Sequence, residues 1–279
     1  MDRLKQRYRS FLATEEGVRA YRAFQRVVYG KEDSLLSQLE TNVLPLVRTS
    51  CSHLRLADVG GGDGRRCRAI VRFLQTGTKA PIELDFIEPS PVMMRYAAAL
   101  LPASARCHSC TFEEMRGTAL PHLCLFVHSV FAIEWPFLCA RIEELCAAGC
   151  QCVVIGDRVD GLVRSLKAIV DANGDGKRTS IDDVEQALCS IGLRVRAVDL
   201  EIPFTCAAGE IDSLEMTLFH WLSLGRRDVC RKFRRVCQDQ SRVENGVVSL
   251  VERERALIVS ADDSGGSDTR RRAEPTGGQ

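Results

Sequence analysis

Apolar and polar positions follow two different periods along most of the chain after residue 50. Short apolar runs alternate with longer segments in which apolar residues recur every three or four positions, the spacings of strands and of amphipathic helices. The predicted strands cover residues 54–60, 82–87, 105–110, 123–130, 150–155 and 193–202, with candidates at 247–251 and 256–259 as a final hairpin. The predicted helices cover residues 65–75, 92–101, 136–148, 162–170, 181–191, 211–224 and 227–237. This alternation predicts an α/β fold with a doubly wound, mostly parallel, seven-stranded sheet and helices on both faces.

The two ends of the chain differ from this middle part. Residues 1–50 carry only helical spacings. A helix predicted over residues 35–47 has Asp33 and Ser34 as cap candidates, and Pro45 should end or kink it. From residue 262 the chain is polar and rich in glycine, which predicts a disordered tail. We therefore expect an N-terminal helical cap over 1–50, one α/β domain over 51–261 and a tail over 262–279.

The stretch LADVGGGDG, residues 56–64, is the strongest chemical feature. An apolar strand ends in Asp58 and is followed by four glycines within five positions, Gly60, Gly61, Gly62 and Gly64. Glycine lets the backbone turn sharply and lets a ligand lie against the main chain. The N-terminal N–H groups of the next helix favour a negatively charged ligand group. The stretch therefore predicts a site for a nucleotide-like cofactor.

Two cofactor classes compete for this turn. The dinucleotide fingerprint Gly-x-Gly-x-x-Gly fails in both registers, because residue 65 is arginine and residue 67 is cysteine. The chain instead has the spacing acid-x-Gly-x-Gly-x-Gly from Asp58 to Gly64. A nicotinamide-dependent oxidoreductase is therefore disfavoured. Ligands of doubly wound sheets bind beyond the carboxyl ends of the strands. This rule brings residues 60–64, 110–112 and 128–131 together with Glu88.

With Glu88 ending the next strand, the pattern resembles the class I S-adenosylmethionine-dependent methyltransferases. The resemblance implies a Rossmann-like methyltransferase domain over 51–261 and S-adenosyl-L-methionine as cofactor. In that family the turn wraps the methionine part, and the acid takes both ribose hydroxyls, which suits the two oxygens of a carboxylate. An apolar residue packs on the adenine, near the loop after the third strand. The implied cofactor contacts are Asp58, Gly60, Gly61, Gly62, Gly64, Glu88, Met93, Thr111, Phe112 and His128.

Within that class, the chain looks like the histamine N-methyltransferase family. The likeness rests on IEPSP after DVGGGDG, on the helical N-terminus and on the segment TSIDDVEQALCSIGL. It implies a small-molecule methyl acceptor whose amine is held by Glu32, although a solvated residue at a helix start is an equal alternative. The chain departs from the family at its substrate contacts. Phe131 and Ala132 stand where the family has two aromatics, and Arg253 stands near a substrate-contacting asparagine, so histamine itself is disfavoured.

His128 is the candidate catalytic base, together with Glu32 in the acceptor site. Methyl transfer from a sulfonium is an in-line displacement that depends mainly on proximity. A base is needed only to take a proton from the nucleophile, and a neutral histidine at the carboxyl end of the fourth strand suits that step. A half-buried histidine with satisfied partners is the alternative.

A second motif lies between residues 162 and 192. Asp171, Asn173 and Asp175 occupy positions 1, 3 and 5 of an EF-hand-like loop, with Gly176 at position 6. The second half is irregular, because the closing acid is aspartate rather than glutamate. The motif predicts either a calcium site or an Asp/Asn/Gly surface turn. The rival function is accordingly a calcium-binding EF-hand-type regulatory protein on an inactive methyltransferase frame.

Composition changes this picture little. The 279 residues carry a formal net charge of +1 with acids and bases interspersed, which gives no nucleic-acid footprint. No long apolar run and no signal region are present, so we expect a cytoplasmic monomer with no membrane contact. The 13 cysteines should be reduced. Cys107 and Cys110 have the spacing of half a zinc site, but a second ligand pair is missing and an alternating strand explains them.

Overall fold

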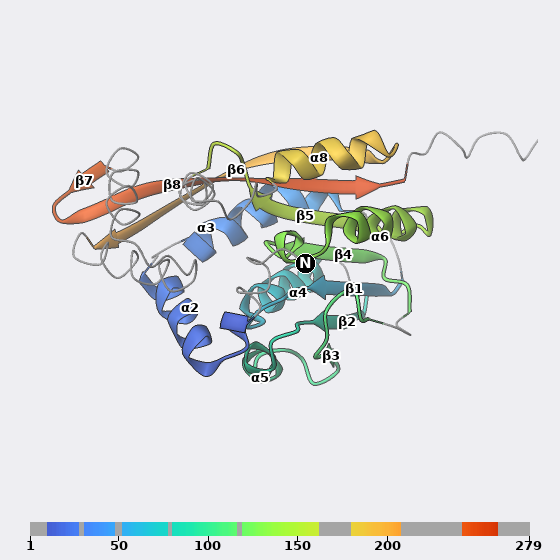
Figure 1. Ribbon diagram of the computed structural model, residues 1–279, viewed down its shortest axis with the longest axis horizontal. Coiled ribbons are helices and arrows are strands. Elements are labelled where there is room, and N and C mark those ends of the chain that lie inside the picture. Colours follow the sequence, from blue (N-terminus) through green and yellow to red (C-terminus); the bar gives the residue numbers. More distant parts are fainter. Residues whose placement is uncertain are drawn as a thin grey trace, which may run out of the picture.

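The structure is a computed structural model that describes residues 10–27, 31–47, 52–77, 80–115, 119–161, 180–207 and 242–261. Their strands form one eight-stranded sheet, in which seven strands follow the order β3-β2-β1-β4-β5-β8-β6 and β7 pairs with β8 (Figure 1). The strands are β1 Leu54–Val59, β2 Ile82–Ile87, β3 Arg106–His108, β4 Leu123–Val127, β5 Gln151–Asp157, β6 Arg194–Ala207, β7 Arg242–Glu244 and β8 Val247–Ser260. The helices are α2 Glu15–Val27, α3 Lys31–Gln38, α4 Arg65–Gly77, α5 Pro91–Ala98, α6 Trp135–Ala147 and α8 Ile181–Ser190.

The sheet is parallel in its first five strands and antiparallel at its end. Strands β1 to β5 pair in parallel, whereas β8 runs antiparallel to both β5 and β6. The predicted α/β fold with a mostly parallel sheet is confirmed. Parallel strands bring their carboxyl ends to one edge, so the ends of β1, β2, β4 and β5 meet there.

The end of the sheet corrects one prediction. The candidates at 247–251 and 256–259 are not a hairpin but one strand, β8, of 14 residues. The charged run from Glu252 to Arg255 interrupts the apolar pattern but keeps its period of two, since Glu252 and Glu254 are buried while Arg253 is exposed. The hairpin partner of β8 is the short β7. The strand predicted to end at residue 202 continues to Ala207.

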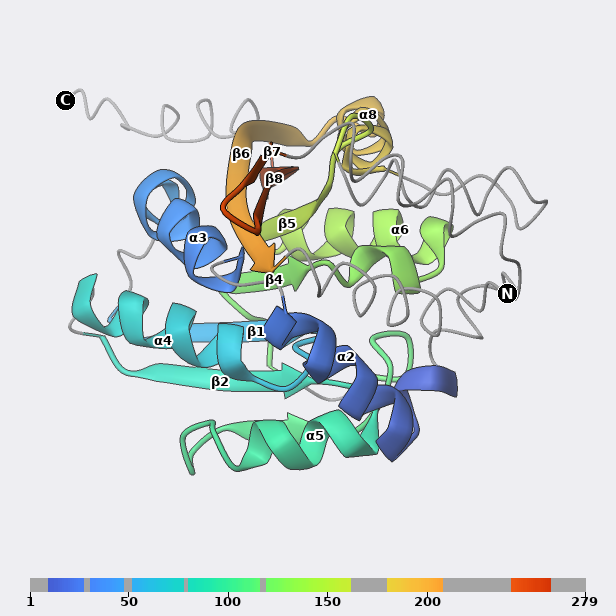
Figure 2. The same ribbon diagram turned by 90° about the vertical axis from the view of Figure 1, so that its left-hand side faces the viewer.

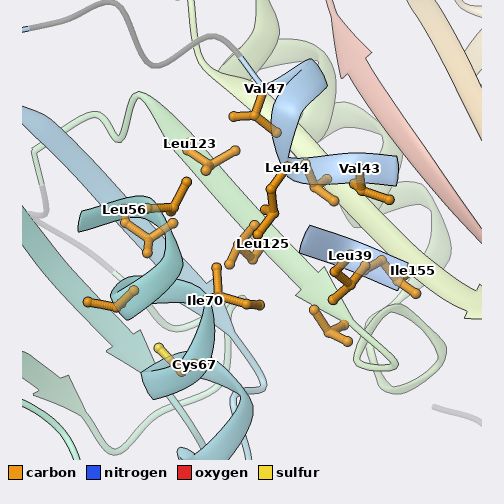
Figure 3. Packing of buried hydrophobic residues seen from close by; sticks show 14 of the residues in the cluster. Leu39, Val43, Leu44, Val47, Leu56, Cys67, Ile70, Leu123, Leu125 and Ile155 are labelled. Atoms are coloured by element: carbon orange, nitrogen blue, oxygen red, sulfur yellow. The ribbon is translucent and has the colours of Figure 1, made fainter. Parts of the chain in front are cut away.

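Helices cover both faces of the sheet, as Figure 2 shows for α3 and α6. On one face, α3, the turns after it and α4 bury an aliphatic cluster that includes Leu39, Leu56 and Ile70 (Figure 3). On the other face, α6 and α8 pack on the alternate strand residues, among them Phe126 and Val154. The predicted inward positions of α4, Cys67, Ile70, Val71 and Leu74, are buried.

The N-terminal segment is helical, as expected, but its second helix starts earlier. Helix α3 begins at Lys31, so Asp33 and Ser34 lie inside its first turn and do not cap it. The Ser34 hydroxyl instead donates to the Pro203 carbonyl at 2.9 Å and ties α3 to β6. After Gln38 the chain continues as a π turn and a 3-10 turn that contains Pro45, where the helix was expected to end or kink.

Several predictions concern residues that the structure leaves undescribed. The helices predicted at 162–170, 211–224 and 227–237, the tail from residue 262 and the EF-hand-like loop with Asp171, Asn173 and Asp175 lie outside the described residues. Within the described ranges, Cys107 is an exposed free thiol on β3 and Cys110 a half-buried one just after it. Among the same residues, no helix has the length and apolar character to cross a membrane.

Candidate functional site

The glycine turn follows β1 at the carboxyl edge of the sheet. Gly60, Gly62 and Gly64 all have positive φ, at 71°, 62° and 79°. The backbone N–H of Gly60 donates to the Ile87 carbonyl at 2.8 Å, which fixes the turn to the end of β2. Since most residues disfavour this conformation, glycine is required at three alternate positions, and this requirement explains the observed spacing.

Two neighbouring glycines of the turn face different surroundings. A Cβ on Gly61 would overlap the ring of Phe86, a buried residue of β2. A Cβ on Gly62 would meet nothing within 4 Å. The turn is therefore packed against the sheet at Gly61 and open at Gly62. Ser129 packs on the turn at Gly60, and its buried hydroxyl has no hydrogen-bond partner among the described residues.

Glu88, at the end of β2, braces this turn. One carboxylate oxygen accepts from the Gly62 N–H at 3.0 Å and the other accepts from the Ser90 N–H at 2.8 Å. Each oxygen keeps capacity for a further donor. Burial raises the pKa of Glu88 to about 6, against the opposing effect of the two backbone hydrogen bonds.

Asp58 and Asp63 add two more buried carboxylates beneath and beside the turn. Burial raises the pKa of Asp58 to about 6, although a hydrogen bond with Cys67 and the charge of Arg66 oppose the rise. Asp63 instead has a cationic partner, because its carboxylate lies 2.7 Å from the Arg65 guanidinium. Asp58, near the end of β1, lies directly beside Gly61 of the turn.

The three residues expected near the adenine differ in accessibility. Met93 is 1% exposed and packs with Leu12 and Val18 of the N-terminal segment. Phe112 packs edge-on against Phe126 at a centroid distance of 5.3 Å, in the core. Thr111 exchanges two hydrogen bonds with Glu114 and shapes the turn after β3. Met93 and Phe112 are core residues here.

His128 follows β4 and has an unusual backbone. Its φ is 58°, a left-handed conformation that is uncommon for any residue except glycine. Its N–H donates to the Ile155 carbonyl at 2.9 Å, which holds this conformation at the sheet edge. Its ring lies between two carboxylates: Nε2 is 3.0 Å from Glu254 Oε2, and Nδ1 is 3.7 Å from Asp157 Oδ1.

The predictions missed the acids around His128. Asp157 ends β5, while Glu252 and Glu254 lie on β8, and all three are buried. The signal was present in the alternation of β8, which puts residues 252 and 254 on one face. Arg253 therefore lies on the opposite, exposed face, where its guanidinium is 3.2 Å from Asp160.

Lys31 at the start of α3 completes this group. Its Nζ lies 3.7 Å from Glu254 Oε1. Burial would lower the pKa of Lys31, but Glu252, Glu254 and Asp157 outweigh burial and raise it. For Glu254, burial would raise the pKa, but His128 and Lys31 outweigh burial and lower it. Among the described residues, carboxylates therefore outnumber cations in this group, and the group already holds the half-buried ammonium of Lys31.

Glu32 has a partner that the sequence did not indicate. The Arg66 guanidinium donates two hydrogen bonds to its carboxylate, both at 2.8 Å. Burial would raise the pKa of Glu32, but Arg66 outweighs burial and lowers it. Both oxygens of the Glu32 carboxylate therefore already accept a hydrogen bond.

Phe131, predicted beside the acceptor, lies in the 3-10 turn Val130–Ala132 after His128.

Solved structures with this fold are methyltransferases in several cases. The chain matches plantazolicin methyltransferase BpumL in complex with SAH, with a TM-score of 0.54, 11% identity and coverage of 94% of this chain and 96% of that one. It matches the YcgJ protein of Bacillus subtilis, with a TM-score of 0.52, 11% identity and coverage of 81% and 98%. Plantazolicin methyltransferase BamL gives a TM-score of 0.52 at 9% identity, with coverage of 94% and 97%. No family model matches the chain. No curated protein matches it. At these identities the likeness establishes the fold.

Proposed function

We propose that this chain is an S-adenosylmethionine-dependent methyltransferase that methylates an amine nitrogen of a small molecule. The observation that carries the proposal is the brace between Glu88 and the glycine turn. The buried Glu88 carboxylate accepts a hydrogen bond from the Gly62 N–H. Of the three glycines at 60–62, Gly62 is the one where an added Cβ would meet no other atom within 4 Å. Other proteins with this fold were solved with SAH.

The residues present fit the cofactor. Gly62 leaves the main chain accessible, Glu88 can accept from a ribose diol, and the unpartnered hydroxyl of Ser129 faces the turn at Gly60. When bound, the cofactor supplies an electrophilic methyl group on a sulfonium. This chain's own part is to hold the donor against the sheet edge and to orient the acceptor, since proximity is the main requirement.

The acidic group around His128 supports an amine as acceptor. Asp157, Glu252 and Glu254 are buried, and beside them His128 and Lys31 reach the surface, with 26% and 22% of their side chains exposed. Among the described residues, carboxylates outnumber cations in this group, which favours a cationic ligand and disfavours an acidic one. The Glu32 carboxylate also interacts electrostatically with His128, but it is already paired with Arg66.

Calorimetric titration with S-adenosylmethionine tests the donor half. We expect micromolar binding to the wild type and its loss in Gly62→Arg, which fills the open side of the turn. Gly192→Arg is the matched control, because Gly192 also has a positive φ, at 82°, and also has nothing within 4 Å of an added Cβ. Equal loss of binding in both variants, or no binding by the wild type, contradicts the donor assignment.

A methyl-transfer assay against biogenic amines, phenols and small acids tests the acceptor half. Transfer to amines above phenols and acids is the expected result, and preferential transfer to an acid contradicts it. Repeating the titration and the assay with calcium and with a chelator addresses the EF-hand-like loop. Methyl transfer that proceeds in the chelator contradicts the rival view of an inactive frame.

A further inference from the structure

His128 is held in a strained position between two elements that are distant in sequence. Its left-handed φ of 58° turns the chain at the end of β4. Ser129, the next residue, packs against Gly60 of the glycine turn. Strain of this kind persists where the surroundings enforce it and is concentrated at functional sites. The imidazole is thus fixed one residue away from the surface that we assign to the methyl donor.

The two ring nitrogens of His128 are not equivalent. Nε2 lies 3.0 Å from Glu254 Oε2, an ion-pair distance to a carboxylate with a side chain that is 0% exposed. Neither oxygen of Glu254 has an aligned hydrogen-bond donor among the described residues. Nδ1 lies 3.7 Å from Asp157 Oδ1, too far for a direct hydrogen bond. A nitrogen atom placed beside both could lie about 2.8 Å from each of them. Nε2 is therefore the ring nitrogen closer to a carboxylate, and Nδ1 faces a second carboxylate at a longer distance.

We propose that Glu254 holds His128 in its Nε2–H tautomer and that the acceptor's ammonium binds between His128 Nδ1 and Asp157. This rests on the proposed function and names the residues that act on its acceptor. His128 is the catalytic base, Asp157 binds the ammonium, and Glu254 is a positioning residue.

The chemical step balances with these groups alone. One N–H bond of the ammonium breaks and its proton goes to Nδ1, which leaves a neutral amine with a free electron pair. That pair forms the new N–C bond as the S–C bond of the sulfonium breaks, and the sulfur keeps the electron pair. The methylated product is again an ammonium and leaves Asp157 by exchange with water or with the next substrate. The His128 side chain is 26% exposed, so Nδ1 releases its proton to water before the next cycle.

In the part of the chain that the structure describes, the charges that face His128 come from four elements. They are Asp157 on β5, Glu252 and Glu254 on β8, Lys31 and Glu32 on α3 and Arg66 on α4. Lys31 and Arg66 each lie beside a carboxylate, at 3.7 Å from Glu254 and 2.8 Å from Glu32. The same His128, Asp157 and Glu254 atoms lie within 4.8 Å of one another, so a divalent cation is the competing ligand.

Nitrogen-15 NMR of the histidine rings tests the tautomer without any acceptor. The signal of His128 among the five histidines is assigned from its loss in His128→Asn. We expect the Nε2–H form in the wild type, a mixture of tautomers in Glu254→Gln, and partial recovery of the Nε2–H form in Glu254→Asp. An unchanged tautomer in Glu254→Gln, in a protein that is still folded and binds S-adenosylhomocysteine, overturns the positioning role of Glu254.

Methylammonium, with methanol as its neutral counterpart, tests the ammonium site. In the presence of S-adenosylhomocysteine we expect methylammonium, but not methanol, to shift the Nδ1 signal of His128. Asp157→Asn should weaken this binding about tenfold or more, the usual size of a charged hydrogen bond. Asp160→Asn, an exposed acid nearby, is the control and should have no effect.

The outcomes separate the two proposals. If the wild type fails to bind S-adenosylhomocysteine, the proposed function fails, whatever His128 does. If S-adenosylhomocysteine binds but methylammonium leaves Nδ1 unchanged, the ammonium site is wrong and the donor assignment stands. If micromolar Mn²⁺ broadens the His128 signals and prevents the methylammonium shift, the three side chains form a metal site and the base assignment is overturned.

Discussion

The proposed donor side and the proposed acceptor side differ in how their residues are brought together. The proposed donor residues, Asp58 to Gly64 and Glu88, lie within one strand–helix–strand unit, and main-chain hydrogen bonds join them. Of the proposed acceptor residues, His128 follows β4, Asp157 ends β5 and Glu254 lies within β8. They come together only because these three strands are neighbours in the sheet. Local backbone geometry therefore defines the donor side, whereas long-range packing defines the acceptor side.

Their electrostatics differ for the same reason. Burial dominates at Asp58 and Glu88, and the pKa of each rises to about 6. At Glu254 the interactions with His128 and Lys31 outweigh burial, and the pKa falls. The donor-side acids are thus close to neutralisation at mildly acidic pH, while the acceptor-side acid stays charged. This contrast leads to four testable predictions.

The largest effect is expected inside the donor turn. Gly61→Ala should destabilise the protein by about 3 kcal/mol, because the new Cβ would overlap the buried Phe86 ring and the strand beneath it has no space to yield. Gly62→Ala, next to it, should cost only about 1–2 kcal/mol, the price of a positive φ in an open site. Urea unfolding measures both. Equal losses would mean that Gly61 is not packed as described.

The second prediction concerns the ion pair between α3 and α4. Glu32→Gln should lower stability by about 1–2 kcal/mol, because it leaves the Arg66 guanidinium without its carboxylate. The pKa of Glu32 is lowered on folding, so this contribution is present above its unfolded value of about 4.5 and is lost as the pH falls below it.

Thermal unfolding at pH 7 and pH 3.5 measures the effect of Glu32→Gln, with Glu40→Gln as the control at an exposed site. The difference between wild type and variant should shrink at pH 3.5. A variant that unfolds like the wild type at pH 7 but has a strongly raised KM for amines would instead identify Glu32 as the amine-binding residue.

The sequence predicted the donor side because its determinants are local. The spacing of Gly60, Gly62 and Gly64 reports three positive φ angles directly, and an acid after an apolar strand marks Glu88. The acceptor side could not be predicted in this way. Glu32 and Arg66 are 34 positions apart and meet only because α3 packs beside α4. Asp157 meets Glu254 only through the antiparallel register of β5 and β8. The sequence predicted Arg253 as a substrate contact, and in the structure its neighbours Glu252 and Glu254 are the residues buried on the His128 side of β8, a face that strand pairing decides.

The third prediction is a pH effect on donor binding. If the ribose diol requires ionised Glu88, the affinity for S-adenosylhomocysteine should fall below pH 6, to about one tenth at pH 5, because the pKa of Glu88 is about 6. Glu88→Gln should bind about tenfold more weakly at pH 7 and should lose this pH dependence. Calorimetry from pH 5 to pH 8 measures both. A pH dependence that persists in Glu88→Gln would assign the titration to Asp58.

The smallest effect is expected at Arg253, on the exposed face of β8. Arg253→Ala should change stability by less than about 0.5 kcal/mol, because its guanidinium pairs at the surface with Asp160. It should also leave the tautomer of His128 and the affinity for methylammonium unchanged, whereas Glu254→Gln, one position further along the strand, should alter the tautomer. The pair compares two faces of a single strand with the same assays. Arg253→Ala could instead weaken methylammonium binding as much as Asp157→Asn does. The acceptor would then bind on the exposed face of β8, where Arg253 lies, and not on the face of Glu252 and Glu254.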